Sequence, residues 1–356
     1  MGDTTISWVA RPGTRARSWN PTQGCEMVSA GCKNCYAMRL AARFADSGWS
    51  KGLIDLKTKK WSREGRLAVH KLAEPLSWRE SSTVFVNSMS DLFWEKFTNE
   101  EIAAVFGVMA ACPQHVFIIA TKRAKRMREW FVWNAEEAKR VAVADPDHPW
   151  WRAFVCIVSA SKAMGRVTDV EIARDGSLIT RGKRDIVSGA GGAHWPLGNV
   201  WLLVSVENQE MADERIPLLL ATPAAIRGIS AEPLLEGLDL TLRGSRIRGW
   251  DEDWKYDTLR GEEWANPHAE VKPGSSPRLN WVITGCESGP GEDVRPAHTE
   301  WFRSLRDQCK KARVPFFFKQ GNVKMDGITA NLGDIGRGGV AEPAMLDGAL
   351  HQEWPG

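Results

Sequence analysis

Short runs of apolar residues recur along the chain, and each of them ends in polar residues. Such runs are typical of parallel strands covered on both faces, because a half-exposed strand would alternate apolar and polar positions instead. The sequence predicts a strand in each of six segments, which are residues 83–87, 115–120, 200–206, 225–230, 281–284 and 314–318.

Helical patterns separate the predicted strands. Thr98 and Glu101 have the spacing of a capping box, and apolar residues follow them at helical intervals. Further helices are predicted over residues 209–220 and 300–312. Strands that alternate with helices predict an α/β fold built from βα repeats with right-handed crossovers. Six or seven strands are too few for a closed barrel of eight.

Two stretches interrupt this alternation and resemble insertions at the rim of a barrel, where loops vary most. They are residues 131–198, which include a Gly-rich segment at 188–192, and residues 244–279. The predicted parts are an amino-terminal half of the barrel with a cysteine loop (1–130), the first insertion (131–198), a continuation of the barrel (199–243), the second insertion (244–279), the carboxy-terminal part of the barrel (280–330) and a tail (331–356).

Composition and charge are those of an ordinary globular chain. The 356 residues include 47 Lys and Arg against 44 Asp and Glu, and 43% are hydrophobic. These values exclude disordered, collagen-like and coiled-coil chains. No secretory signal and no long apolar segment is visible, so we expect a cytoplasmic protein without a membrane span, in a reducing compartment.

Three of the seven cysteines fall close together. Cys25, Cys32 and Cys35 have the spacing C-x6-C-x2-C, in a loop that leads into a predicted helix. Clustered thiols in a reducing compartment favour metal or redox chemistry over disulfides. Three thiolates suit a 4Fe–4S cluster whose fourth iron has no protein ligand. A structural zinc ion is the alternative, and it requires a fourth ligand, for which His70 and His115 are candidates through the fold.

Polar residues follow every predicted strand. Because the carboxyl ends of parallel strands meet at one mouth of a βα fold, these residues predict a ligand site there. The candidates are Ser88, Ser90, Asp91, Lys122, Arg123, Glu207, Asn208, Glu232, Glu287 and Lys319.

A basic segment follows the second predicted strand. Residues 122–128 contain five cations in seven positions, and Arg11, Arg15 and Arg17 precede the cysteine loop. Basic residues at the mouth of the fold predict contacts with the phosphates of DNA. A solvated helix face is the alternative interpretation of such a run.

The residues around the cysteines resemble a known family. The segment 19–37, with W-N-P-T-x-G-C followed by S-A-G-C-x-x-C-Y-A, is similar to the phage-associated three-Cys-motif family, a radical S-adenosylmethionine-like group. Five further motifs match in the same order, at residues 84–93, 204–209, 230–235, 285–290 and 315–320. The resemblance covers residues 5–130 and 199–322 and skips both insertions. It extends, more distantly, to spore photoproduct lyase, a radical enzyme that repairs thymine lesions in DNA.

The resemblance implies a partial, six-stranded βα barrel of the radical S-adenosylmethionine type, with Cys25, Cys32 and Cys35 as the ligands of a 4Fe–4S cluster. It implies that S-adenosylmethionine binds the open iron and that an external electron donor reduces the cluster. Cleavage of the sulfonium would then give a 5′-deoxyadenosyl radical that abstracts hydrogen from the substrate. The usual pattern has three residues between the first two cysteines and an aromatic residue before the last one. This chain has six residues there, and Asn34 takes the aromatic position.

The same resemblance suggests cofactor contacts at the strand ends. Ser88, Ser90 and Asp91 are expected near the amino group of the methionine moiety, with Asp91 as its ion-pair partner. Glu207 and Asn208 are expected near the ribose hydroxyls. The alternatives are a carboxylate at a helix start for Asp91 and plain polar strand ends for the other two.

The remaining candidates are expected to contact the cofactor or the substrate. Lys122 and Glu232 are predicted cofactor contacts, Lys122 through a carboxylate or phosphate group. Arg123, Glu287 and Lys319 are predicted substrate contacts. Structural ion pairs for the acidic residues, and a solvated side chain for Lys319, are the alternatives.

Three functions follow from this sequence. The first is a radical enzyme that acts on a nucleobase in DNA, in repair or in thymidine hypermodification, for which the base has to leave the stack of a duplex. The second is a radical enzyme that acts on a peptide or a small metabolite. The third is a nucleic-acid-binding protein that holds a structural zinc ion and carries out no catalysis.

Overall fold

A computed structural model describes residues 3–46, 48–142, 145, 148, 150–165, 169–172, 178–181, 194–246, 253–264, 276–288, 294–321 and 344–356. The chain divides into two compact units. The first consists of Met1–Glu26, Ala37–Leu202 and Thr222–Ala225, and the second of Met27–Tyr36, Leu203–Ala221 and Ile226–Gly356.

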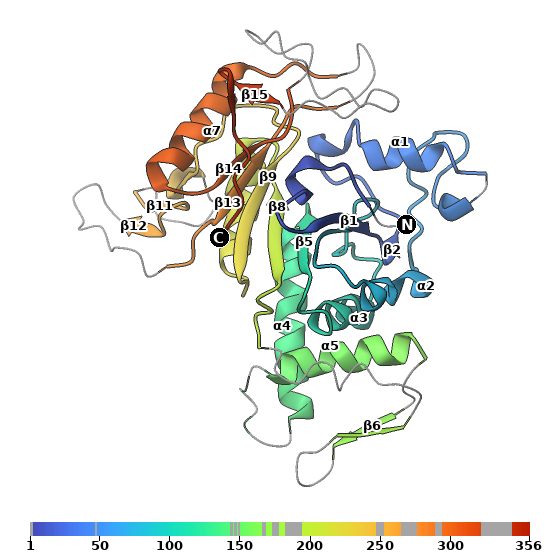
Figure 1. Cartoon of the computed structure of the whole chain (residues 1–356). Helices are drawn as coiled ribbons and strands as arrows, with labels where there is room; N and C mark the ends of the chain where they lie inside the picture. Colours follow the sequence, from blue (N-terminus) through green and yellow to red (C-terminus); the bar gives the residue numbers. More distant parts are fainter. Residues whose placement is uncertain are drawn as a thin grey trace. The chain divides into compact units, whose positions relative to one another are not determined.

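The main sheet has seven strands in the order β1-β4-β5-β8-β9-β13-β14 (Figure 1). Their bounds are β1 Arg15–Trp19, β4 Ser82–Val86, β5 Val116–Thr121, β8 Val200–Ser205, β9 Ile226–Ala231, β13 Trp281–Thr284 and β14 Phe316–Phe318. In the first unit, β1, β4 and β5 pair in parallel, and in the second unit β9, β13 and β14 do the same. The boundary between the units falls inside β8.

All six predicted strands are therefore confirmed, and the α/β fold with a large parallel sheet is compatible with a partial βα barrel. The sheet has seven strands, within the count of six or seven from the sequence and one more than the six that the resemblance implies, because it also contains β1. This strand reads R-A-R-S-W and is half exposed along most of its length, so it lacks the apolar run that identified the other six.

The helices between the strands start and end close to the predicted positions. Thr98 caps α3 (Asn99–Ala110) through the complete capping box with Glu101. The other helices of the βα repeats are α4 (Ala124–Val141), α5 (Trp150–Ala163), α6 (Gln209–Leu220) and α7 (Thr299–Ala312). The shorter helices are α1 (Tyr36–Ala42) and α2 (Val69–Leu72), with 3-10 turns at Ser7–Val9, Ala30–Cys32, Gly48–Ser50, Glu74–Ser77 and Gly244–Arg246.

Small sheets occupy the rest of the described chain. In the first unit, β2 (Thr22–Gln23) pairs with β3 (Arg66–Leu67), and β6 (Asp169–Ile172) pairs with β7 (Leu178–Arg181). In the second unit, β10 (Thr241–Arg243), β11 (Lys255–Asp257) and β12 (Glu262–Trp264) form an antiparallel sheet, and β15 (Met345–Leu346) pairs with β16 (Ala349–Leu350). The predicted domain boundary at residue 130 falls inside α4. The Gly-rich segment 188–192, much of the second insertion and residues 331–343 of the tail lie outside the described residues.

Each unit has its own apolar core. In the first unit α3 is buried from Ile102 to Ala110, which is typical of a helix that is apolar all round, and α5 lies against it (Figure 1). In the second unit the apolar face of α7 packs on β14, where the rings of Phe302 and Phe318 lie 5.3 Å apart. None of the described helices is both long and apolar enough to cross a membrane.

A close backbone approach fixes the contact between α3 and α5. A Cβ atom at Gly107 would lie 2.1 Å from the carbonyl oxygen of Cys156 and 2.8 Å from the Cβ of Ala160. Only glycine therefore allows the two helices to approach this closely.

We predict that Gly107→Ala destabilises the protein by about 1–3 kcal/mol, the usual cost of overpacking, although alanine is the better helix former. Urea unfolding measures the effect. Gly198→Ala is the matched control, because a Cβ atom there meets nothing within 4 Å, and we expect a change within about 0.5 kcal/mol. Equal stability of the two variants would show that the α3–α5 contact relaxes without cost.

Candidate functional site

The seven cysteines form no disulfide and fall into two classes by exposure. Four of them are fully buried, and burial raises the pKa of the Cys112 thiol to about 12 and raises the pKa of Cys156 and Cys309 as well. Cys25, Cys32 and Cys35 are partly exposed. The three partly exposed cysteines are therefore the three that the sequence singles out.

Cys25 belongs to the first unit and follows a constrained backbone. Gly24 has a φ of +95°, and a Cβ atom there would lie 2.1 Å from the carbonyl oxygen of Glu64. Glycine is thus the residue that lets the chain turn from β2 into Cys25. Gly24 also forms a parallel bridge with Ser90, just beyond the end of β4.

Side chains after β4 hold the segment that leads to Cys25. The Asn20 amide donates to the Ser88 hydroxyl at 3.1 Å and accepts from the Met89 backbone at 2.8 Å. The Ser90 hydroxyl donates to the Thr22 carbonyl at 2.9 Å. Ser88 and Ser90 therefore lie against residues 20–24, and they fix the approach to the first cysteine.

Asp91 is buried and joins the ends of β4 and β5. Its carboxylate accepts the Thr121 hydroxyl at 2.7 Å, the Lys122 backbone N–H at 3.0 Å and the Phe93 backbone N–H at 3.0 Å. The Lys122 ammonium has no hydrogen-bond or ion-pair partner in the part of the chain that the structure describes.

Arg123 is also buried, and it reaches the residue next to Cys25. Its guanidinium pairs with Glu95 and donates to the Glu26 carbonyl at 3.1 Å. Arg126 donates to the Asn99 side chain at 2.8 Å, at the start of α3. Two of the five cations in the basic segment thus bind other parts of the first unit.

Cys32 and Cys35 belong to the second unit and share one turn. The Cys35 N–H donates to the Cys32 carbonyl at 3.3 Å, and residues Ala30–Cys32 form a 3-10 turn just before it. Glu207, which follows β8, accepts the Gly31 N–H at 3.1 Å and the Arg215 guanidinium at 3.0 Å. Glu207 is 0% exposed, so its carboxylate contacts the turn from the buried side.

Glu287 holds the same turn from β13. Its carboxylate accepts the Asn34 side-chain amide at 2.8 Å and pairs with Arg295, whose backbone N–H also donates at 2.9 Å. Burial alone would raise the pKa of Glu287, but the hydrogen bonds from Arg295 and Asn34 outweigh it and lower the pKa below its ordinary value. The carboxylate is therefore ionised at neutral pH.

The other candidates of the second unit make local contacts. Glu232, after β9, forms an ion pair with Lys319, after β14, so the structure brings these two predicted residues together. Asn208 caps α6 by accepting the Met211 N–H at 3.0 Å. The contacts with cofactor and substrate that the sequence suggests for the strand-end residues stay predictions.

The donor set fits an iron–sulfur cluster in its chemistry, since three accessible thiols are soft ligands of the kind such clusters use. Among the described residues, no group of three or more His, Cys, Asp or Glu side chains is arranged to hold a metal ion. Cys25 lies in one compact unit, and Cys32 and Cys35 lie in the other.

The sequence did not reveal the hydrogen-bond and ion-pair partners of the side chains that follow the strands. Asn34, Arg215 and Arg295 carry the contacts around the Cys32–Cys35 turn. Each arginine follows its glutamate by eight residues, a spacing outside the local i,i+3 and i,i+4 patterns that sequence reading uses. The W-N-P-T segment was visible, but the hydrogen bonds of Asn20 and Thr22 to residues 88–90 were not.

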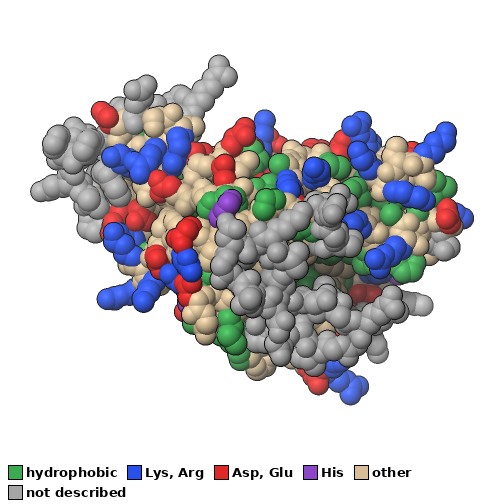
Figure 2. Space-filling view, turned by 90° about the horizontal axis from the view of Figure 1, so that it is seen from above, with side chains coloured by type: hydrophobic (Ala, Val, Ile, Leu, Met, Phe, Trp, Pro, Cys, Tyr) green, Lys and Arg blue, Asp and Glu red, His purple; other side chains and the backbone are tan. Residues whose placement is uncertain are grey.

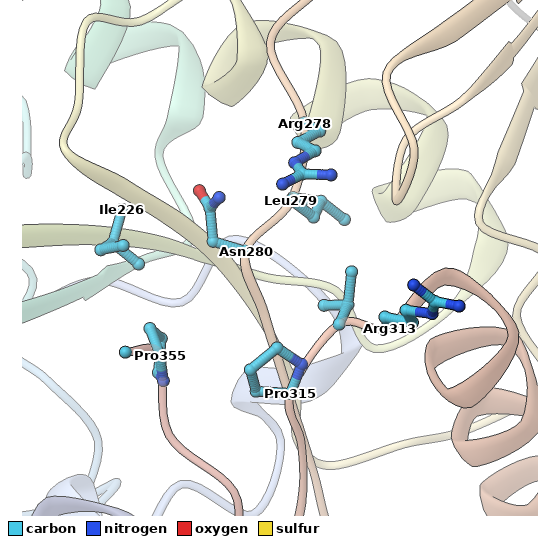
Figure 3. Close-up of a pocket in the computed structure, with 9 residues that line it drawn as sticks. Ile226, Arg278, Leu279, Asn280, Arg313, Pro315 and Pro355 are labelled. Atoms are coloured by element: carbon cyan, nitrogen blue, oxygen red, sulfur yellow. The ribbon is translucent and has the colours of Figure 1, made fainter. Parts of the chain in front are cut away.

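A cavity of about 190 Å³ lies elsewhere in the second unit (Figure 3). Its lining includes Ile226 at the start of β9, Leu279 and Asn280 just before β13, and Pro315 just before β14. It therefore lies at the amino ends of these strands, whereas Glu232, Glu287 and Lys319 follow their carboxyl ends.

We predict that iodoacetamide modifies Cys25, Cys32 and Cys35 in the folded, metal-free protein and leaves Cys112, Cys156, Cys286 and Cys309 unmodified until the chain unfolds. Peptide mass spectrometry of the alkylated protein measures each site, and a sample alkylated in denaturant is the control. Modification of a buried cysteine at the rate of Cys25 would contradict the division into two classes.

Comparison with known proteins leaves the activity open. No curated protein and no solved structure matches the chain. Residues 3–355 match the family described as "Protein of unknown function (DUF5131)". The chain belongs to that family.

Proposed function

We propose that the protein is a radical S-adenosylmethionine enzyme that acts on a nucleobase in DNA, with Cys25, Cys32 and Cys35 as the ligands of a 4Fe–4S cluster. One observation carries this proposal. Of the seven cysteines, only these three are partly exposed, and hydrogen bonds from residues at the strand ends hold the segments that carry them.

The number of thiols favours a cluster over a structural zinc ion. A closed zinc site takes four protein ligands, whereas the sequence places only three cysteines together in this loop. A cluster with three cysteine ligands leaves one iron available to a small molecule. When bound and reduced, such a cluster supplies an electron to S-adenosylmethionine, which splits into methionine and a 5′-deoxyadenosyl radical.

Residues at the strand ends hold the segments that carry the cysteines, and others supply charged groups for a ligand. Ser90 and Arg123 hold the backbone on either side of Cys25 in the first unit, and Glu207 and Glu287 hold the Cys32–Cys35 turn in the second. The Glu232–Lys319 ion pair joins the carboxyl ends of β9 and β14, and it is the proposed contact for a polar ligand at the strand ends.

The basic segment has fewer cations available for DNA than the sequence suggests. Arg123 and Arg126 bind within the first unit, which leaves Lys122, Lys125 and Arg128 for phosphate contacts. On the face shown in Figure 2, Lys and Arg side chains lie among Asp and Glu side chains. The proposal of a nucleobase substrate therefore rests on the resemblance to radical enzymes of phages and of thymine repair, together with these three cations.

We predict that anaerobic reconstitution with iron and sulfide gives a protein that forms 5′-deoxyadenosine from S-adenosylmethionine when dithionite is added. Cys25→Ala, Cys32→Ala and Cys35→Ala should each lose cluster iron and this product, because each removes one ligand. Iron and sulfide analysis, with chromatography of the nucleoside, measures both.

Cys112→Ala is the matched control, since it removes a buried thiol, and we expect it to keep both cluster and product. Zinc without sulfide in the native protein, together with no 5′-deoxyadenosine, would overturn the radical function. Product whose yield is unchanged by DNA but raised by a peptide or small metabolite would instead move the substrate to that class.

We predict that DNA binding weakens and its salt dependence falls in the triple variant Lys122→Ala, Lys125→Ala, Arg128→Ala. Each lost phosphate contact lowers the slope of log affinity against log salt by about 0.9, so the slope should fall by up to about three. Fluorescence anisotropy with a labelled duplex at several salt concentrations measures this.

Lys310→Ala with Lys311→Ala provides the control, because these two exposed cations lie at the end of α7, in the other unit. An unchanged slope in the triple variant would remove the basic segment from the DNA interface without affecting the cluster assignment.

A further inference from the structure

We infer that Glu207 and Glu287 are positioning residues that hold the Cys32–Cys35 turn ready for its metal before the metal binds. The inference deepens the proposed function, on which it rests for the identity of the metal group. Its basis is a pattern in the contacts. Gly31, which Glu207 binds, directly precedes Cys32, and Asn34, which Glu287 binds, directly precedes Cys35.

Both carboxylates are held where an ionised group is costly. Glu207 is 0% and Glu287 is 5% exposed, and an ionised group at such depth requires a partner. Arg215 and Arg295 are those partners. Arg215 is fixed in turn by the Ser205 carbonyl, to which it donates at 2.7 Å.

A charged acceptor has a specific advantage at this turn. Hydrogen bonds to an ionised carboxylate are shorter and about twice as strong as those to a neutral acceptor. The arginines compensate the buried charge, and the remaining acceptor capacity goes to the Gly31 N–H and the Asn34 amide. The two contacts hold the turn on both sides of Lys33, through the backbone N–H of Gly31 and through the side-chain amide of Asn34.

Fixing the turn in advance changes metal affinity. Two thiols in a loose loop have to lose backbone freedom when they bind one metal centre, and that loss subtracts from the binding free energy. Partners behind metal ligands typically change metal affinity by about 10–100-fold when they are removed. A purely structural ion pair would stabilise the fold but would not contact the two residues that precede the ligands.

The chain offers a clean test at Asn34. Asn34→Ala removes the hydrogen bond to Glu287 and leaves the buried Glu287–Arg295 pair in place, so the fold should survive. Glu287→Gln removes the charge while keeping an acceptor oxygen. If the two substitutions act through the same hydrogen bond, their effects do not add. The double variant should then bind iron no less tightly than the single variant that binds it more weakly.

The first readout needs no metal. In the metal-free full-length protein we expect iodoacetamide to modify Cys32 and Cys35 about fivefold faster in Asn34→Ala than in the wild type, the factor that corresponds to loss of one net hydrogen bond. Cys25 lies outside this turn and is the internal reference, with an unchanged rate. Thermal unfolding followed by circular dichroism checks that the variants fold.

The second readout is metal retention and the signature of the cluster. In competition with a chelator, we expect reconstituted Asn34→Ala and Glu287→Gln to hold iron about 10–100-fold less tightly than the wild type. The electron paramagnetic resonance spectrum of the reduced Glu287→Gln protein should also shift. Asp213→Asn is the matched control, because it neutralises a buried carboxylate whose partners are Arg246 and Gln209 and not residues of the turn.

The outcomes separate this inference from the proposed function. Wild-type alkylation rates and wild-type iron retention in both Asn34→Ala and Glu287→Gln would overturn the positioning role. A wild-type protein that takes up no cluster would overturn the proposed function. Faster alkylation of Cys32 and Cys35 in Asn34→Ala would still support the positioning role in that case.

Discussion

Under the proposed function, the loop that carries the cysteines faces two opposed requirements, since its thiols have to stay accessible while its backbone has to stay fixed. Apolar packing fixes most of the chain, but it also buries what it fixes, as it does for Cys112 and Cys156. The second unit resolves the conflict with charged hydrogen-bond acceptors placed behind the loop. Because Glu207 and Glu287 bind the residues that precede Cys32 and Cys35, they order the turn through the Gly31 backbone and the Asn34 side chain.

The first unit applies the same principle with other residues. Ser88, Ser90 and Arg123 bind backbone or side-chain groups between Asn20 and Glu26, and Gly24 allows the turn into Cys25. Polar residues at the ends of parallel strands usually indicate a ligand site, because the strand ends converge on one edge of the sheet. In this chain, Ser88, Ser90 and Arg123 in the first unit and Glu207 and Glu287 in the second instead bind the segments that carry the cysteines.

The sequence was informative where local patterns decide the structure. The apolar runs of β4, β5, β8, β9, β13 and β14 and the capping box of α3 are local, and all are confirmed. The strand β1 was missed because its position in the sheet depends on pairing with β4, about 67 residues away in sequence, and not on its own polar composition. The positions of the candidate residues at strand ends were also predictable. Their partners were not, because Glu207 and Gly31 are 176 residues apart and Glu287 and Asn34 are 253 apart.

The contacts of the strand-end residues limit the positions at which they can bind a ligand. Asp91, Glu207 and Glu287 have carboxylates that already accept two or more hydrogen bonds, and all three are buried. A ligand that displaced one of them would leave an N–H or a guanidinium without its acceptor, which costs more than a new contact returns. Lys122 in the first unit and the Glu232–Lys319 pair in the second differ, since no hydrogen bond in the described part of the chain joins their side chains to the cysteine loop. Ligand recognition by the strand ends is therefore expected at those residues, while Glu207 and Glu287 hold the residues that precede Cys32 and Cys35.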